Sequence, residues 1–115
     1  MYSYLDPSRA QEFAMDKAQM LTLAETFESS LTNDLQALQD ALGHPDPDPL
    51  RRLLHSLKGY VTFLSKDDLS AQVIELESAS RQHEPDKVRD MVMKALPSLQ
   101  QLLAEVSRWK SAELS

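Results

Sequence analysis

Apolar residues recur along most of the chain at the spacing of an α-helix. Between residues 20 and 42 they follow one another at steps of three and four, which places them on one helical face. This face comprises Met20, Leu23, Phe27, Leu31, Leu35, Leu38 and Leu42. We expect the helix to end at Gly43, a natural C′ residue, because Pro45, Pro47 and Pro49 forbid its continuation.

A second apolar stripe follows the prolines and is the cleanest in the sequence. It predicts a helix that begins around Asp48 and Pro49 and keeps its leucine and valine residues on one side. The stripe comprises Leu50, Leu53, Leu54, Leu57, Val61 and Leu64. Ser65 is then expected to cap the next helix at its N-terminus, with Asp68 supplying negative charge near the start.

Two more helices complete the pattern. The first would bury Leu69, Val73 and Leu76 and end at segment 84–86, which contains a proline. The apolar face of the second comprises Val88, Met91, Val92, Ala95, Leu96, Leu99, Leu102, Leu103 and Val106. Pro97 lies within this last helix and removes one backbone donor, so we expect a kink or a short break there.

Near the start of the chain, Asp6 and Pro7 suit the N-cap and the first position of a short additional helix. Four substantial amphipathic helices joined by short connections predict an all-α fold. We expect an antiparallel four-helix bundle with this short N-terminal helix and a kinked C-terminal helix. No domain boundary or internal repeat interrupts residues 1–115, so the chain is expected to form a single domain.

Composition narrows the class of protein. The 115 residues carry a net charge of −6, which argues against a nucleic-acid partner because phosphates attract basic surfaces. The absence of cysteine and the presence of only two glycines exclude thiolate metal sites and glycine-rich phosphate loops. His44 and His83 lack the spacing of a zinc site, so no metal is expected. With neither an apolar run of bilayer length nor a signal peptide, we expect a soluble, cytoplasmic protein without membrane contact, and a monomer.

The helix around residue 55 carries the candidate chemistry. At about 100° per residue, with Leu50 at zero, His55 lies near 140° and therefore outside the apolar stripe. The residues on the same side are Arg51, Lys58, Gly59, Thr62 and Lys66. Between Pro49 and Lys66 the sequence has four basic residues and no acidic one. The sequence thus predicts that His55 is exposed in the middle of a helix and surrounded by basic side chains.

Each of these features suits a phosphorylated histidine. A neutral, exposed imidazole can attack a phosphoryl group through a ring nitrogen. Lys58 can offset the charge of the added phosphate, and Gly59 leaves space for a partner to close over His55. A glycine in mid-helix costs about 1 kcal/mol relative to alanine, so its presence there needs a reason. Taken singly, each feature is also compatible with an ordinary solvated helix face.

The pentapeptide His55-Ser56-Leu57-Lys58-Gly59 resembles the His-x-Leu-Lys-Gly signature of histidine-containing phosphotransfer (HPt) domains. Leu64 stands where that family keeps an apolar residue. The segment 69–77, which ends in Leu76-Glu77, is similar to the helix that follows in the family. The resemblance covers roughly residues 15–108.

The resemblance implies a four-helix bundle in which His55 accepts a phosphoryl group, Lys58 stabilises the phosphate and Gly59 provides clearance for the partner. That partner would be the receiver domain of a response regulator, of a hybrid sensor histidine kinase, or both. It would supply Mg²⁺ and the catalytic pocket, so the chain would be a phosphoryl carrier with no cofactor and no catalysis of its own. The residues expected to form the docking surface are Arg51, Arg52, Thr62, Phe63 and Lys66.

Two alternatives stay open. Tyr60, Phe63 and Ser65 depart from the family's usual pattern, which leaves room for a degenerate helical adaptor that binds a signalling partner without phosphorylation. A small helical chaperone or secretion regulator would suit the acidic composition but would leave the basic side of this helix unexplained. Phe63 itself could either pack on a neighbouring helix or dock a partner, and packing is slightly favoured.

Overall fold

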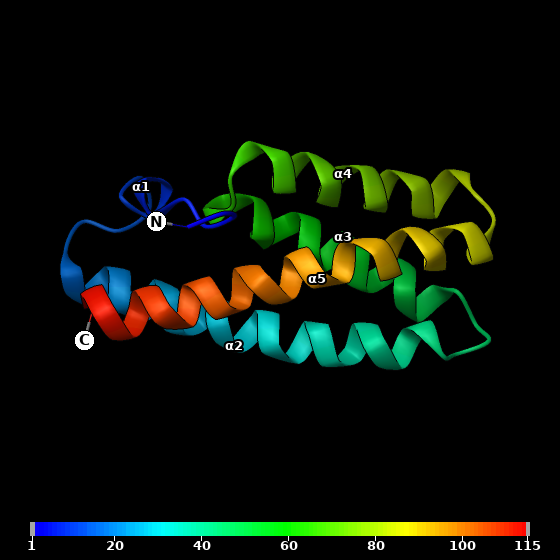
Figure 1. The fold of residues 1–115 in the computed structure, drawn as a ribbon, viewed down its shortest axis with the longest axis horizontal. Helices are drawn as coiled ribbons and strands as arrows, with labels where there is room; N and C mark the ends of the chain where they lie inside the picture. The colour runs from blue at the N-terminus through cyan, green and yellow to red at the C-terminus, as the bar shows by residue number, and fades with distance from the viewer. Residues whose placement is uncertain (1, 115) are drawn as a thin grey trace.

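The computed structural model describes residues 2–114. Four long helices run side by side with alternating direction, which confirms the predicted all-α antiparallel bundle (Figure 1). The elements are α1 (Pro7–Ala10), α2 (Lys17–Leu42), α3 (Asp48–Leu64), α4 (Asp67–Gln82), α5 (Pro85–Trp109) and a π-helical turn, η1 (Lys110–Leu114).

The long helices enclose one core. α2 packs on α3 and α5, and α4 packs on the same two helices (Figure 1). Leucines that are almost wholly buried fill the centre: Leu31, Leu38, Leu54, Leu57, Leu64, Leu69, Leu99 and Leu102. The short α1 packs against α3 at the end of the bundle where η1 also lies. The side of α3 that faces away from this core is exposed to solvent over most of its length.

Aspartates cap the first two helices. Asp6 accepts a hydrogen bond from the backbone of the first turn of α1, and Pro7 takes the first position, as predicted. The carboxylate of Asp16 accepts a hydrogen bond from the backbone N–H of Gln19 at the start of α2. Gly43 follows α2 as expected, but its φ is −90°, so the left-handed conformation of a C′ glycine is not adopted. The prolines beyond it are what prevent continuation.

The prediction that Ser65 caps α4 is wrong. Ser65 ends α3, and the residue before α4 is Lys66, whose side chain makes no capping bond. An antiparallel β-bridge joins Ser65 to Leu5, and the backbone of Lys66 is extended as well, so the helix begins one residue later than predicted. Beside the bridge, the backbone N–H of Lys66 donates to the carbonyl oxygen of Tyr4 at 2.7 Å. Pairing with the N-terminal segment therefore determines this helix boundary.

α5 runs unbroken from Pro85 to Trp109, so the short break considered at Pro97 does not occur. Pro97 is exposed, and the backbone donor that it lacks is therefore missing on the solvent side of the helix. At the end of α5, Trp109 is buried within the core.

A buried carboxylate of α5 holds the start of the chain. Glu105 is 1% exposed and accepts hydrogen bonds from the backbone N–H groups of Ser3, Tyr4 and Leu5, with N···O distances of 3.1, 2.8 and 2.9 Å. Burial alone would raise the pKa of the Glu105 carboxyl. These three bonds and one from Gln101 outweigh burial and hold that pKa below its ordinary value. The N-terminal segment is therefore fastened to the bundle through its backbone.

Candidate functional site

The exposed face of α3 carries His55 in the middle of the helix. The His55 side chain is 78% exposed, whereas Leu54 and Leu57 beside it are fully buried. A Cβ atom added at Gly59 would meet nothing within 4 Å, so the surface one turn beyond the imidazole is open. The predicted orientation, with His55 and Gly59 on the solvent side of the helix, is confirmed.

Glu77 of α4 lies against the imidazole, a position that helix periodicity did not predict. Its Oε1 atom is 3.4 Å from Nδ1 of His55 and 3.9 Å from Nζ of Lys58. Its Oε2 atom accepts a hydrogen bond from Nε of Arg81 at 3.0 Å and forms an ion pair with an Nη atom of the same guanidinium at 2.9 Å. The surroundings of His55 thus include a carboxylate with a 7% exposed side chain, and not cations alone.

The ionised state of Glu77 determines which ring nitrogen of His55 carries the proton. Burial raises the pKa of the Glu77 carboxyl, but hydrogen bonds from His55 and Arg81 and the positive charges of Arg81 and Lys58 hold that pKa below its ordinary value. A carboxylate only accepts hydrogen bonds, so the ring nitrogen that faces it, Nδ1, carries the proton in the neutral imidazole. The lone pair of Nε2 is then directed away from Glu77.

Arg51 and Arg52 precede His55 by one turn and border the same open hollow, which has a volume of about 370 Å³. Arg51 is fixed in place because its Nε donates to the carbonyl oxygen of Ser80 at 3.1 Å. The hollow is lined by Arg51, Arg52, His55, Glu77, Ser80 and Arg81. Three guanidinium groups around one imidazole favour the approach of an anion.

Thr62, Phe63 and Lys66 lie toward the far end of α3 and do not surround His55. The Thr62 hydroxyl donates to a carbonyl oxygen one turn earlier in the helix. Lys66 Nζ donates to the carbonyl oxygen of Tyr2 at 2.5 Å and so holds the N-terminal segment. The Phe63 ring stacks on Phe13 with ring centroids 5.1 Å apart and is still 48% exposed. Phe63 therefore packs on the segment after α1.

Tyr60, one of the departures from the family pattern, faces away from the His55 surface. Its hydroxyl donates to the Asp34 carboxylate of α2 at 2.8 Å, and its ring meets Phe27 edge to face. Burial, together with the neighbouring Asp34 charge, raises the pKa of the Tyr60 hydroxyl. Tyr60 is thus a contact between α3 and α2, and its bulk leaves the exposed face of α3 unobstructed.

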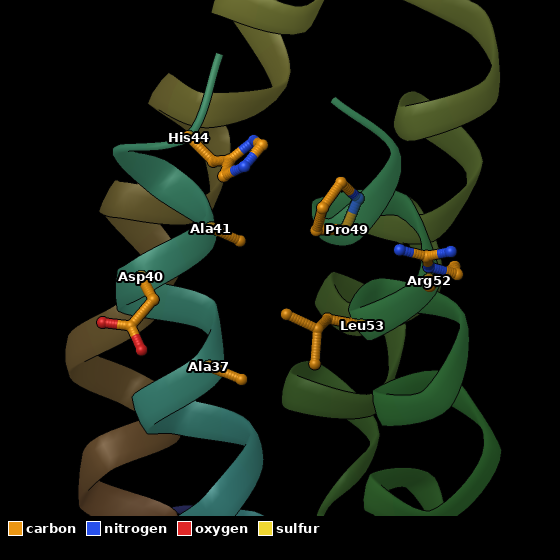
Figure 2. A pocket seen from close by; sticks show the side chains of 7 residues that line it. All are labelled: Ala37, Asp40, Ala41, His44, Pro49, Arg52 and Leu53. Carbon is orange, nitrogen blue, oxygen red and sulfur yellow. The ribbon is translucent and has the colours of Figure 1, made fainter. Parts of the chain in front are cut away.

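A second hollow, of about 410 Å³, opens between the end of α2 and the start of α3. Figure 2 shows small side chains of α2, Ala37 and Ala41, across from Leu53 of α3. Its lining residues are Ala37, Asp40, Ala41, His44, Pro49, Arg52 and Leu53. Because Arg52 borders both hollows, the second one lies directly beside the surface that carries His55.

The other two histidines do not line the hollow that contains His55. His44 is in the α2–α3 connection, where its Nδ1 accepts a hydrogen bond from the backbone N–H of Asp46, and His83 is exposed at the end of α4. Within residues 2–114, no group of three or more His, Cys, Asp or Glu side chains is arranged to hold a metal ion. In that same range, none of the helices combines the length and the apolar character needed to cross a membrane.

A four-helix bundle that displays a histidine in mid-helix, followed by a lysine and a glycine, defines a class of small phosphotransfer domains. Comparison with protein-family models supports this class, since the Hpt domain matches residues 22–109, and the chain belongs to the Hpt family. Hpt domains carry phosphoryl groups in phosphorelays, interact with receiver domains of two-component proteins and are generally not catalytic. Comparisons with curated proteins and with solved structures found no match.

Proposed function

We propose that the chain is a phosphorelay carrier that accepts a phosphoryl group on Nε2 of His55 from a receiver-domain aspartate and passes it to another. The observation that carries the proposal is the exposed imidazole whose Nδ1 faces the buried Glu77 carboxylate. The receiver would belong to a response regulator or to a hybrid sensor histidine kinase. A cytoplasmic location and a monomeric state, both expected from the sequence, are part of this proposal.

The proposed transfer balances without a further reactant. The Nε2 lone pair of the neutral His55 ring forms a bond to phosphorus as the bond between phosphorus and the aspartate oxygen breaks, and the aspartate leaves as a carboxylate. The ring keeps its Nδ1 proton and becomes positively charged. Glu77, 3.4 Å from Nδ1, lies where it offsets that charge. Transfer to a second aspartate restores the neutral ring.

Lys58 and Gly59 have distinct parts in this proposal. Lys58 forms an ion pair with Glu77, and the Lys58 side chain is 40% exposed. Its ammonium group can therefore turn toward a phosphate on His55. Gly59 presents bare backbone, which lets the receiver approach the ring closely. The proposal requires no cofactor on this chain, because the receiver would bind Mg²⁺ and orient the phosphoryl group.

Incubation with phosphorylated receiver domains and Mg²⁺ tests the proposal. The wild-type chain should gain a label that is labile in acid and stable in base, as a phosphohistidine is. His55→Gln should take up no label, Lys58→Ala should take it up more slowly, and His83→Gln, which alters an exposed histidine elsewhere, should behave as wild type.

An unlabelled wild-type chain across the organism's full panel of receivers would refute the carrier function. That result would favour the alternative in which the same bundle is an adaptor that binds a signalling partner without phosphorylation.

A further inference from the structure

Exposed apolar side chains gather at one end of the α3 face. Among the described residues, five large apolar side chains are strongly exposed, and two of them, Phe13 at 53% and Phe63 at 48%, contact each other here. Met15, which is 93% exposed, follows Phe13 by two residues. Phe13 and Met15 belong to the connection between α1 and α2, whereas Phe63 is in the last turn of α3. A cluster of this kind on a small protein indicates an interaction surface more often than a solitary exposed residue does.

The chain holds this cluster in a defined position. Arg9 of α1 donates to the carbonyl oxygen of Thr62 at 3.3 Å and forms an ion pair with Asp67. Farther upstream, Glu105 binds three successive backbone N–H groups of the N-terminal segment. An aromatic ring on a fastened segment loses little conformational freedom when a partner covers it. All of residues 2–21 lie outside the part of the chain that matches the Hpt domain.

The aromatic pair lies within the area that a partner docked over His55 would cover. Phe63 follows His55 by eight residues, which is about 12 Å along the helix axis and about 80° around it. Gly59, which is exposed, lies midway between them on the same strip of surface. A specific interface buries about 800 Å² of each partner, equivalent to a disc of about 16 Å radius.

We propose that Phe13 and Phe63 form a second contact for the receiver domain and determine which receivers exchange phosphate with His55. The inference rests on the proposed function. The receiver is the occupant because the aromatic pair is continuous with the His55 surface. Charge also fits, since Arg51, Arg52 and Arg81 line the hollow that contains His55, within a chain of net charge −6. That surface complements the acidic Mg²⁺-binding pocket of a receiver.

The charged contact around His55 and the apolar contact at Phe13 and Phe63 would have different roles in recognition. Charge around His55 suits the acidic pocket that receivers share and does not distinguish one receiver from another. An apolar contact about 12 Å away meets a part of the receiver surface outside that pocket, and such a contact discriminates by shape and burial.

The test compares Phe13→Ser with Met93→Ser, which removes an apolar side chain of similar exposure, 59%, from α5. Phosphotransfer from each member of a panel of phosphorylated receiver domains gives KM and kcat. Labelling by phosphoramidate, a small donor that needs no docking surface, measures the intrinsic reactivity of His55.

For the best receiver of the wild type, Phe13→Ser should raise KM about five- to thirtyfold with little change in kcat. Its phosphoramidate labelling and urea midpoint should stay at wild-type values, as should every parameter of Met93→Ser.

The possible outcomes distinguish failure of the Phe13–Phe63 contact from failure of phosphotransfer by His55. If Phe13→Ser and the wild type have equal KM, or if Met93→Ser raises KM as much, the inference is overturned while phosphotransfer stands. A parallel loss of phosphoramidate labelling or of stability in Phe13→Ser would assign Phe13 a structural role and would also overturn it. A wild-type chain that no receiver labels removes the proposed function, and the inference falls with it.

Discussion

Replacing Glu105 by glutamine tests how the N-terminal segment is fastened. In the structure Oε1 accepts the backbone N–H groups of Tyr4 and Leu5, and Oε2 accepts that of Ser3. Glutamine has nearly the same shape, but it is neutral and has only one acceptor oxygen. In its best orientation it keeps the two bonds at the Oε1 position and turns an NH₂ group toward the N–H of Ser3. The side chain of Gln101, which donates to Oε2 at 3.0 Å, can turn its own oxygen toward that NH₂ group and keep a bond.

The expected loss follows from these three bonds. A hydrogen bond to a charged group contributes about 1.5–3 kcal/mol and one between neutral groups about 1 kcal/mol. Weakening two bonds by at least about 0.5 kcal/mol each and losing one of at least about 1.5 kcal/mol gives a minimum of about 2.5 kcal/mol, part of which is offset as the Ser3 N–H finds water. The loss cannot exceed the free energy that holds the segment on the bundle, to which burial of the Leu5 side chain contributes about 2 kcal/mol besides these hydrogen bonds.

Hydrogen exchange measured residue by residue is the suitable assay, because it reports local opening. The amides of Tyr4 and Leu5 should exchange about 30- to 100-fold faster in Glu105→Gln than in the wild type. Glu75→Gln, which neutralises an exposed glutamate on α4, provides the matched control and should leave these amides unchanged. Equal exchange of Tyr4 and Leu5 in the two variants would refute the role given to Glu105.

Three further predictions concern the His55 surface and stability in acid. Gly59→Ala should raise the free energy of unfolding in urea by about 0.5–1 kcal/mol, because alanine favours a helix and its methyl group meets nothing within 4 Å. Glu77→Gln should slow receiver-dependent labelling about tenfold, with an unchanged circular dichroism spectrum, because the charge that holds the Nδ1 proton is lost. The free energy of unfolding should fall as the pH drops below 4.5, the ordinary pKa of Glu77 and Glu105. Both carboxyls have lowered pKa values in the folded chain, so the stability they contribute is present above that pH and is lost as the pH passes through the folded-state values.

Contrary results are equally clear. A less stable Gly59→Ala would mean that the surface of α3 is not open at that position. Wild-type labelling by Glu77→Gln would remove Glu77 from the transfer. If Glu105→Gln lost stability in acid as steeply as the wild type does, other carboxylates would be responsible for that share of the acid sensitivity.

The long helices could be predicted because each carries its own apolar stripe and its own end signals. Asp6 with Pro7 is a local signal for a helix start and was correctly interpreted. Ser65 has an equally suitable local sequence, but its conformation is determined by Leu5, sixty residues earlier, and no local pattern reveals that pairing. The role of Glu105 in fastening the N-terminal segment was missed for the same reason.

The exposure of His55 and Gly59 could be predicted because both lie on one helix, whose geometry places them. Glu77 faces His55 only once α4 packs on α3, so helix periodicity alone could not pair them. A signal was nevertheless present, since Glu77 follows Leu76 and lies one turn after Val73, on the side of its helix that packs. An acidic residue at such a position needs partners, and Arg81 four residues later is one.

The role of His55 as phospho-acceptor is tested most directly by locating the phosphorus atom on the labelled chain. NMR of the ¹⁵N-labelled protein after phosphorylation by a receiver identifies the ring nitrogen that is bonded to phosphorus. We expect phosphorus on Nε2 of His55, with the proton still on Nδ1 opposite Glu77. Phosphorus on Nδ1 of that ring, on His44 or His83, or on no histidine would contradict this account.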